Sequence, residues 1–295
     1  MNGSAPPIGW IGLGAIGLPM ATRAAAAGRR VWAYDPVAER CDAARKAGIS
    51  IAADAADVGR RAGRLIACVV RSLSQADEAL LGERGALRAA PGRLAVVMSS
   101  VGAAGMAELG ARAGELGGRL VDAPILGNAA SAAAGSVTLV VSGAAADVAE
   151  ALPLLDELSG SVVDVGARLG AAQAMKMTSQ LLQIVGMVAT IEGMRLAERY
   201  DVARETALEV LDATAPASWT TRNWAYACDL WARRDPTTSL GLFAKDLAAA
   251  VADARAARLA LPLTEEALDL IAERLDVPAG RGRVHIGHES TQHFP

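Results

Sequence analysis

The sequence predicts an α/β fold, in which an N-terminal doubly wound sheet is followed by an all-helical C-terminal domain, and a long helix joins the two. Short apolar runs alternate with helical patterns up to residue 165, as expected of repeated βα units. The stretch 169–200 contains no proline and is rich in good helix formers, and only helical patterns follow it before the tail. We therefore place one domain over residues 1–165 and a second over residues 166–295.

The first strand, Ile8–Ile11, ends in a glycine-rich turn that opens a helix. The turn reads Gly12-Leu13-Gly14-Ala15-Ile16-Gly17, and its glycines have the spacing of a dinucleotide-binding fingerprint. The first glycine permits the tight turn, the second lets the backbone approach a pyrophosphate, and the third lets helix and strand pack closely. A Rossmann-type domain is expected, with all six residues of the turn binding the cofactor. The alternative is a glycine turn that binds no nucleotide.

An acidic residue follows the second strand, Val31–Tyr34. Asp35 lies roughly 20 residues beyond the glycine turn, where a carboxylate can accept the ribose hydroxyls of NAD and repel the 2′-phosphate of NADP. No arginine directly follows it, because Pro36 does. NAD is therefore the predicted cofactor and NADP is less favoured. The alternative is that Asp35 only caps the next helix.

The remaining elements continue the alternation and then become helical. Further strands are expected at residues 50–52, 65–70, 94–98, 119–122, 137–141 and 162–165. Helices are expected between them at residues 53–62, 73–81 and 103–116, and beyond the long helix at residues 205–214, 220–231, 242–259 and 263–275.

The long helix is apolar on nearly every face, so we expect it to be buried on nearly every face. Lys176 is the single ionisable group in its first half, and no carboxylate lies within one turn of it. A buried, unpaired ammonium is costly unless it loses its proton or a ligand supplies the counter-charge. Lys176 is therefore either a lysine that snorkels from a helix end or a functional group.

Composition argues against several classes of protein. The net charge is −3 with no basic block, which argues against nucleic-acid binding, and no run of about twenty residues is apolar without interruption, which argues against a membrane span. The N-terminus lacks the pattern of a signal peptide, and the three cysteines are far apart, so a cytoplasmic protein without disulfides is expected. No metal site is expected, because no ligand set completes the tail histidines His285, His288 and His293.

Four stretches of the chain match the motifs of a known family in order and spacing. They are residues 12–20, residues 122–128 followed by Gly135 and Gly143, residues 170–176, and residues 245–247 with the alanine-rich helix that follows. Together they resemble the cofactor, substrate, catalytic-lysine and late cofactor-contact motifs of the β-hydroxyacid dehydrogenases. The resemblance implies an oxidoreductase that transfers a hydride between NAD(P) and a small β-hydroxy acid such as 3-hydroxyisobutyrate, or reduces a semialdehyde.

The resemblance assigns roles to individual residues. Lys176 becomes the general acid/base that exchanges a proton with the substrate hydroxyl while the hydride moves. Burial and the positive nicotinamide ring both disfavour its charged form. Further cofactor contacts are implied for Val70, Ser100 and Lys245, although Lys245 and Asp246 would otherwise be interpreted as the capped start of a helix. The implied substrate contacts are Ser100, Leu126, Gly127, Asn128 and Gln180.

The chain departs from the family at its substrate motif. Leu126, Gly127 and Asn128 stand where the family usually has Ser-Gly-Gly, so a hydroxyl is lost and bulk is added at the carboxylate end. Gln180 replaces an asparagine one turn beyond Lys176, on the same helix face. Arg71 replaces a proline and is either a solvated loop residue or a carboxylate anchor. The resemblance therefore leaves the identity of the carboxylic acid open.

Two other functions stay open. An imine reductase-like NADPH enzyme shares the architecture but usually lacks a lysine at position 176, and a non-catalytic sensor would use the fold only to bind a dinucleotide. A full 6-phosphogluconate dehydrogenase would need a much longer helical part.

Residues 169–191 are apolar on more faces than one small helical domain can cover, so a homodimer or homotetramer is expected.

Overall fold

The computed structural model describes residues 6–237 and 239–277, which leaves the three tail histidines outside the described residues. The chain forms two compact units, unit 1 (Met1–Lys176) and unit 2 (Met177–Pro295). The division falls within the long helix α9 (Ala171–Arg199), whereas the sequence places the domain boundary in the turn before it. The helix is continuous across the division over its 29 residues.

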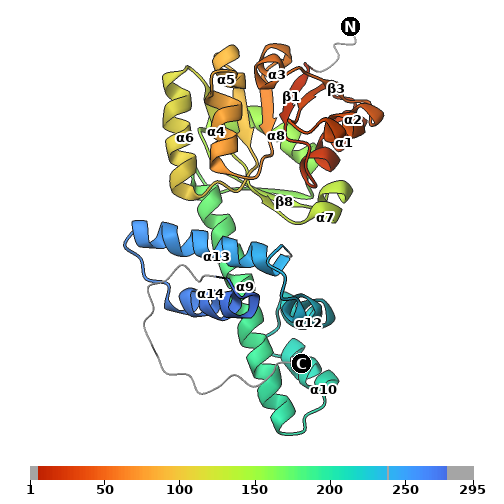
Figure 1. Ribbon diagram of the computed structural model, residues 1–295, viewed down its shortest axis with the longest axis vertical. Helices are drawn as coiled ribbons and strands as arrows, with labels where there is room; N and C mark the ends of the chain where they lie inside the picture. The colour runs from red at the N-terminus through yellow and green to blue at the C-terminus, as the bar shows by residue number, and fades with distance from the viewer. Residues whose placement is uncertain (1–5, 238, 278–295) are drawn as a thin grey trace. The chain divides into compact units, whose positions relative to one another are not determined.

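Unit 1 is built on a six-stranded parallel sheet with the order β3-β2-β1-β4-β5-β6 (Figure 1). Its strands are β1 (Ile8–Ile11), β2 (Val31–Tyr34), β3 (Ser50–Ile51), β4 (Leu65–Cys68), β5 (Leu94–Val97) and β6 (Arg119–Asp122). Every residue of β1, β4 and β5 is buried, because helices cover both faces of the sheet. The predicted doubly wound sheet is confirmed, and the strand order reverses beside β1, where ligands of such sheets bind.

The core of unit 1 lies on both faces of this sheet, because alternate strand residues point to opposite sides. Leu65 and Ala67 of β4 pack in one apolar cluster, while Ile66 and the fully buried Cys68 pack in the other. The covering helices include α1 (Gly17–Ala26), α2 (Ala38–Lys46), α3 (Ala55–Arg61), α4 (Leu73–Leu81), α5 (Ala86–Ala89) and α6 (Ala103–Glu115).

The last strands of unit 1 form a separate three-stranded sheet rather than extending the first. It contains β7 (Ile125–Leu126), β8 (Thr138–Val141) and β9 (Ser161–Asp164), with α7 (Ala129–Ala134) and α8 (Ala145–Leu158) in the connections. The sequence predicts β8 and β9 but misses β7, because two residues carry no periodicity. It also misses α8, whose interior contains Pro153.

The described part of unit 2 is helical, as predicted. After α9 it contains α10 (Arg204–Asp212), α11 (Trp219–Arg222), α12 (Trp224–Ala232), α13 (Ser239–Ala256) and α14 (Pro262–Leu275). The single helix predicted at 220–231 breaks at Asn223, which ends α11 and precedes α12. Among the described helices, none is long and apolar enough to cross a membrane.

The prediction that α9 is buried on nearly every face is wrong for a single chain. Ile184, Met187 and Ile191 pack in the core of unit 2, but Leu182 is 64% exposed and Leu196 is 62% exposed. One stripe of the helix therefore contacts its own unit, and apolar side chains elsewhere on the helix face outward.

Candidate active site

The glycine turn at the carboxyl end of β1 is shaped by its own backbone. Gly12 has φ +97°, and a Cβ there would lie 2.1 Å from the carbonyl oxygen of Val69. A Cβ on Gly17 would lie 2.2 Å from the carbonyl oxygen of Gly12. A Cβ on Gly14 would meet nothing within 4 Å, so the space in front of this residue is open. The turn therefore fits a group that must approach its backbone closely, as a pyrophosphate does.

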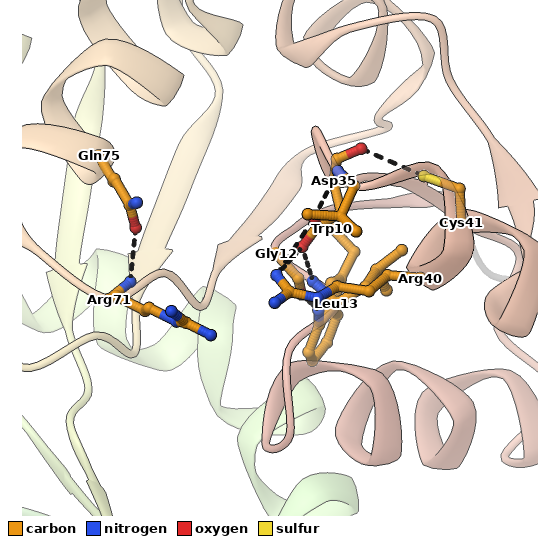
Figure 2. Close-up of polar contacts among 9 residues, drawn as sticks. Trp10, Gly12, Leu13, Asp35, Arg40, Cys41, Arg71 and Gln75 are labelled. Atoms are coloured by element: carbon orange, nitrogen blue, oxygen red, sulfur yellow. Dashed lines mark hydrogen bonds and ion pairs between the residues drawn. The ribbon is translucent and has the colours of Figure 1, made fainter. Parts of the chain in front are cut away.

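Asp35 ties the end of β2 to this turn (Figure 2). The carboxylate is only 5% exposed, and its oxygens accept hydrogen bonds from the N–H of Leu13 at 2.8 Å and of Val37 at 2.9 Å. Arg40 Nη1 lies 3.3 Å from both carboxylate oxygens. The sequence predicts Asp35 at this site but misses Arg40, which a search one turn into the following helix would have found.

Val70 and Ser100 follow the adjacent strands β4 and β5 and therefore reach the same edge of the sheet as the glycine turn. The N–H of Val70 donates to Ser99 Oγ at 2.7 Å, which joins the two strand ends. Arg71 is exposed in the loop after β4, and its N–H donates to Gln75 Oε1 at 3.0 Å. In Figure 2 the Arg71 side chain extends from this loop in the direction of the glycine turn.

Lys176 is half-buried near the start of α9. Its Nζ donates hydrogen bonds to Ser100 Oγ at 2.7 Å and to the carbonyl oxygen of Ile125 at 2.9 Å. Lys176 therefore has hydrogen-bond partners that the sequence did not reveal, and its assignment as a functional group stays a prediction. The structure does bring together Lys176 and Ser100, two of the predicted site residues.

A buried carboxylate, Asp122, lies at the start of α9, the helix that carries Lys176. Asp122 is 0% exposed at the end of β6 and accepts hydrogen bonds from the backbone N–H groups of Gly170 at 3.2 Å and Gln173 at 3.1 Å. Gln173 Nε2 donates to the same carboxylate at 2.6 Å, and Ser142 Oγ at 3.3 Å. Burial raises the pKa of Asp122, while these hydrogen bonds act in the opposite direction. The sequence contains both residues in motifs but gave no sign of this pairing.

The predicted substrate residues of the second motif lie at β7 and α7. Leu126 is half-buried in β7, while Gly127 and Asn128 are exposed. The Asn128 side chain accepts a hydrogen bond from the N–H of Ser131 at 3.0 Å and caps α7. Asn128 therefore has a structural task of its own, which the sequence did not reveal.

Gln180 and Lys245 belong to unit 2. Gln180 Nε2 donates to Asp246 Oδ2 at 2.8 Å, so two helices of this unit are joined beside the late cofactor-contact motif. Lys245 and Asp246 lie inside α13 rather than at its start, so a capping role is excluded. Lys245 is exposed.

Comparison with known proteins confirms the resemblance. Residues 7–166 match the NAD binding domain of 6-phosphogluconate dehydrogenase, and residues 170–282 match the family described as NAD-binding of NADP-dependent 3-hydroxyisobutyrate dehydrogenase. L-threonate dehydrogenase of Cupriavidus necator is 33% identical over 88% of this chain and 87% of its own. Human mitochondrial 3-hydroxyisobutyrate dehydrogenase is 31% identical over 73% of this chain and 64% of its own.

The fold is also found among solved structures. The 3-hydroxyisobutyrate dehydrogenase of Mycobacterium tuberculosis with L-serine superimposes with a TM-score of 0.82, at 24% identity over 91% of this chain and 93% of its own. At that identity the similarity shows only a shared fold. The family assignment rests instead on the sequence matches to residues 7–166 and 170–282 and on the 33% identical relative. The chain therefore belongs to the β-hydroxyacid dehydrogenase family, whose members are NAD(P)-dependent oxidoreductases acting on the CH–OH group of small hydroxy acids.

Proposed function

We propose that Lys176 is the general acid/base of a dehydrogenase whose substrate is a small β-hydroxy acid related to L-threonate or 3-hydroxyisobutyrate, on which the matched relatives act by name. The observation that carries the proposal is the pair of hydrogen bonds from Lys176 Nζ to Ser100 Oγ and the Ile125 carbonyl oxygen. They hold the amine at the edge of unit 1 that also carries the glycine turn. In this proposal residues 1–165 bind the dinucleotide and residues 166–295 form the helical domain.

Different residues of the chain then have separate roles in proton transfer, cofactor binding and substrate binding. As a neutral amine, Lys176 has two N–H groups for Ser100 Oγ and the Ile125 carbonyl oxygen, and a lone pair for the proton of the substrate hydroxyl. The nicotinamide, when bound, takes up or supplies the hydride. In the reduction direction, protonated Lys176 donates to the carbonyl oxygen. The glycine turn would hold the pyrophosphate, with Val70, Ser100 and Lys245 as further cofactor contacts. Leu126, Gly127, Asn128 and Gln180 are the proposed substrate contacts.

NAD is the proposed cofactor because the Asp35 carboxylate lies at the end of β2 beside the glycine turn, where it can accept the ribose hydroxyls. The neighbouring Arg40 supports NADP as the second candidate. Its guanidinium is 3.3 Å from both oxygens of Asp35 and offsets their charge, and an arginine near this position can donate hydrogen bonds to a 2′-phosphate. We therefore expect NAD to be preferred, but not exclusively.

A homodimer or homotetramer is part of the proposal. What supports it is the outward apolar surface of α9, where Leu182 and Leu196 are mostly exposed in the single chain. Light scattering at micromolar concentration should give at least twice the chain mass of 30.2 kDa, and a monodisperse monomer would contradict this part. A cytoplasmic location stays a prediction from the sequence.

The decisive experiment is a panel of β-hydroxy acids, including L-threonate and 3-hydroxyisobutyrate, assayed for reduction of NAD and of NADP. Activity on one of them, lost in Lys176→Ala, is the expected result. A blank panel together with measurable dinucleotide binding would favour the sensor. Reduction of a cyclic imine by NADPH, retained in Lys176→Ala, would favour the imine reductase instead.

A further inference from the structure

Two buried polar residues, Asp122 and Gln173, are hydrogen-bonded to each other at the start of α9, within about one turn of the proposed acid/base Lys176. We propose that they are positioning residues, which fix Ser100 and Ile125, two residues that accept hydrogen bonds from Lys176, relative to the start of α9. Neither residue touches Lys176 Nζ through any hydrogen bond described above, so they would act through the residues that do. The inference rests on the proposed role of Lys176.

The Gln173 side chain forms hydrogen bonds with the backbone on either side of Ser100, one of the residues that accept from Lys176. Its Oε1 accepts the N–H of Val101 at 3.0 Å, and its Nε2 donates to the carbonyl oxygen of Ser99 at 3.0 Å. Between these two lies Ser100, whose Oγ accepts from Lys176 Nζ at 2.7 Å. Gln173 and Lys176 are one turn apart on the same face of α9. The amide therefore sets the distance between the helix that carries the lysine and the loop that carries its acceptor.

Asp122 fixes Ile125, another residue that accepts from Lys176. Its carboxylate binds the N–H groups of Gly170 and Gln173 at the start of α9, where backbone donors lack partners within the helix and a negative charge is stabilising. Three residues after Asp122, the carbonyl oxygen of Ile125 accepts from Lys176 Nζ at 2.9 Å. The carboxylate thereby ties the helix start to the short segment that carries this carbonyl.

The burial of the pair distinguishes it from ordinary core. Asp122 is 0% exposed and Gln173 is 1% exposed, and burying such groups is costly even when they are hydrogen-bonded. An apolar pair of similar volume would leave backbone groups of Gly170, Val101 and Ser99 without these partners, so the pair also stabilises the fold. The positioning role therefore has to be tested by a measurement other than stability.

The test is Gln173→Leu in the full-length chain. We expect kcat to fall roughly 10- to 100-fold, since a small misplacement of a catalytic group has effects of this size, with KM for NAD changed less than about threefold. The kinetic pKa of the base in the kcat–pH profile should also move, because Ser100 no longer has a fixed position. A crystal structure of the variant should show Lys176 Nζ displaced from Ser100 Oγ.

Two variants control for general destabilisation. Leu154→Ala creates a cavity at a fully buried leucine of α8, and Ser159→Ala removes a buried hydrogen bond from Ser159 Oγ to the carbonyl oxygen of Leu155. Both should lower the melting temperature while leaving kcat and the pH profile unchanged below it. If Gln173→Leu does not fold, Asp122→Asn provides the same test, because its amide nitrogen faces donors that require an acceptor.

The outcomes separate this inference from the proposed function. A folded Gln173→Leu or Asp122→Asn protein with the native kcat and pH profile, beside an inactive Lys176→Ala protein, overturns the positioning role alone. Full activity of Lys176→Ala overturns both. The conservative variant Gln173→Glu should also have a lowered kcat, because it keeps an acceptor for the N–H of Val101 but loses the donors to Ser99 and Asp122.

Discussion

The two ends of the proposed site in unit 1 are built by different means. At the glycine turn, shape comes from the backbone: Gly12 adopts φ +97° and lies so close to Val69 that no side chain fits. At Lys176, shape comes from buried side chains, since Gln173 and Asp122 join segments that are 48 to 74 residues apart in the sequence. Changes at the first end should therefore alter cofactor binding, and changes at the second should alter the chemical step.

The largest expected effect is at the lysine. Lys176→Ala should lower kcat roughly 10²–10⁴-fold, the usual contribution of a general acid/base. NAD affinity, measured by calorimetry, should change little, because the glycine turn and Asp35 are untouched.

Lys176→Arg serves as the matched variant for charge. A guanidinium stays protonated and cannot accept the proton, so activity should not return. An active Lys176→Arg protein would show that position 176 supplies only a positive charge. The assignment of the chemical step to this end of the site would then be wrong.

The next effect is at the cofactor end. Asp35→Ala should weaken NAD binding roughly 10- to 100-fold, because hydrogen bonds to a charged group contribute roughly 1.5–3 kcal/mol. NADP binding should fall less. Glu39→Ala, which removes an exposed carboxylate from the same segment, is the control and should leave both affinities as they are. Equal losses for NAD and NADP in Asp35→Ala would mean that the carboxylate only supports the turn.

A smaller change should follow from Arg40→Ala. The guanidinium is partly exposed, so solvent screens its charge, and the affinity for NADP should fall only about tenfold. Binding of adenosine 2′,5′-bisphosphate should weaken, while binding of AMP should not. If both ligands weaken alike, Arg40 orients Asp35 and makes no contact with a 2′-phosphate.

The smallest expected effect concerns selectivity. If Leu126 narrows the carboxylate end of the substrate pocket, Leu126→Ser should raise kcat/KM for 3-hydroxyisobutyrate relative to the native substrate, by several-fold. The control is Leu152→Ser, a partly exposed leucine of α8. Loss of activity on every acid would instead indicate that Leu126 is needed for packing, and selectivity would then have to be sought at Asn128 and Gln180.

The same contrast explains what the sequence could predict. The alternation of strands and helices, the glycine turn and Asp35 depend on neighbours in the chain, and their patterns are visible in a single sequence. The two-residue strand β7, the bond from the Gly170 N–H to Asp122 and the bond from Gln180 to Asp246 follow from how distant segments meet in three dimensions. Lys176 was noticeable because its charge conflicts with its apolar helix, but its partners were not.

The buried end of β4 has a practical consequence. Burial raises the pKa of the Cys68 thiol to about 12, so the reactive thiolate is scarce at any assay pH. An alkylating reagent can modify this cysteine only when the parallel sheet opens, whereas Cys228, in unit 2, is partly accessible in the folded state. The natural thiols are thus internal reporters, and mass spectrometry of pulse-labelled protein would time the opening of the nucleotide-binding sheet separately from that of the helices.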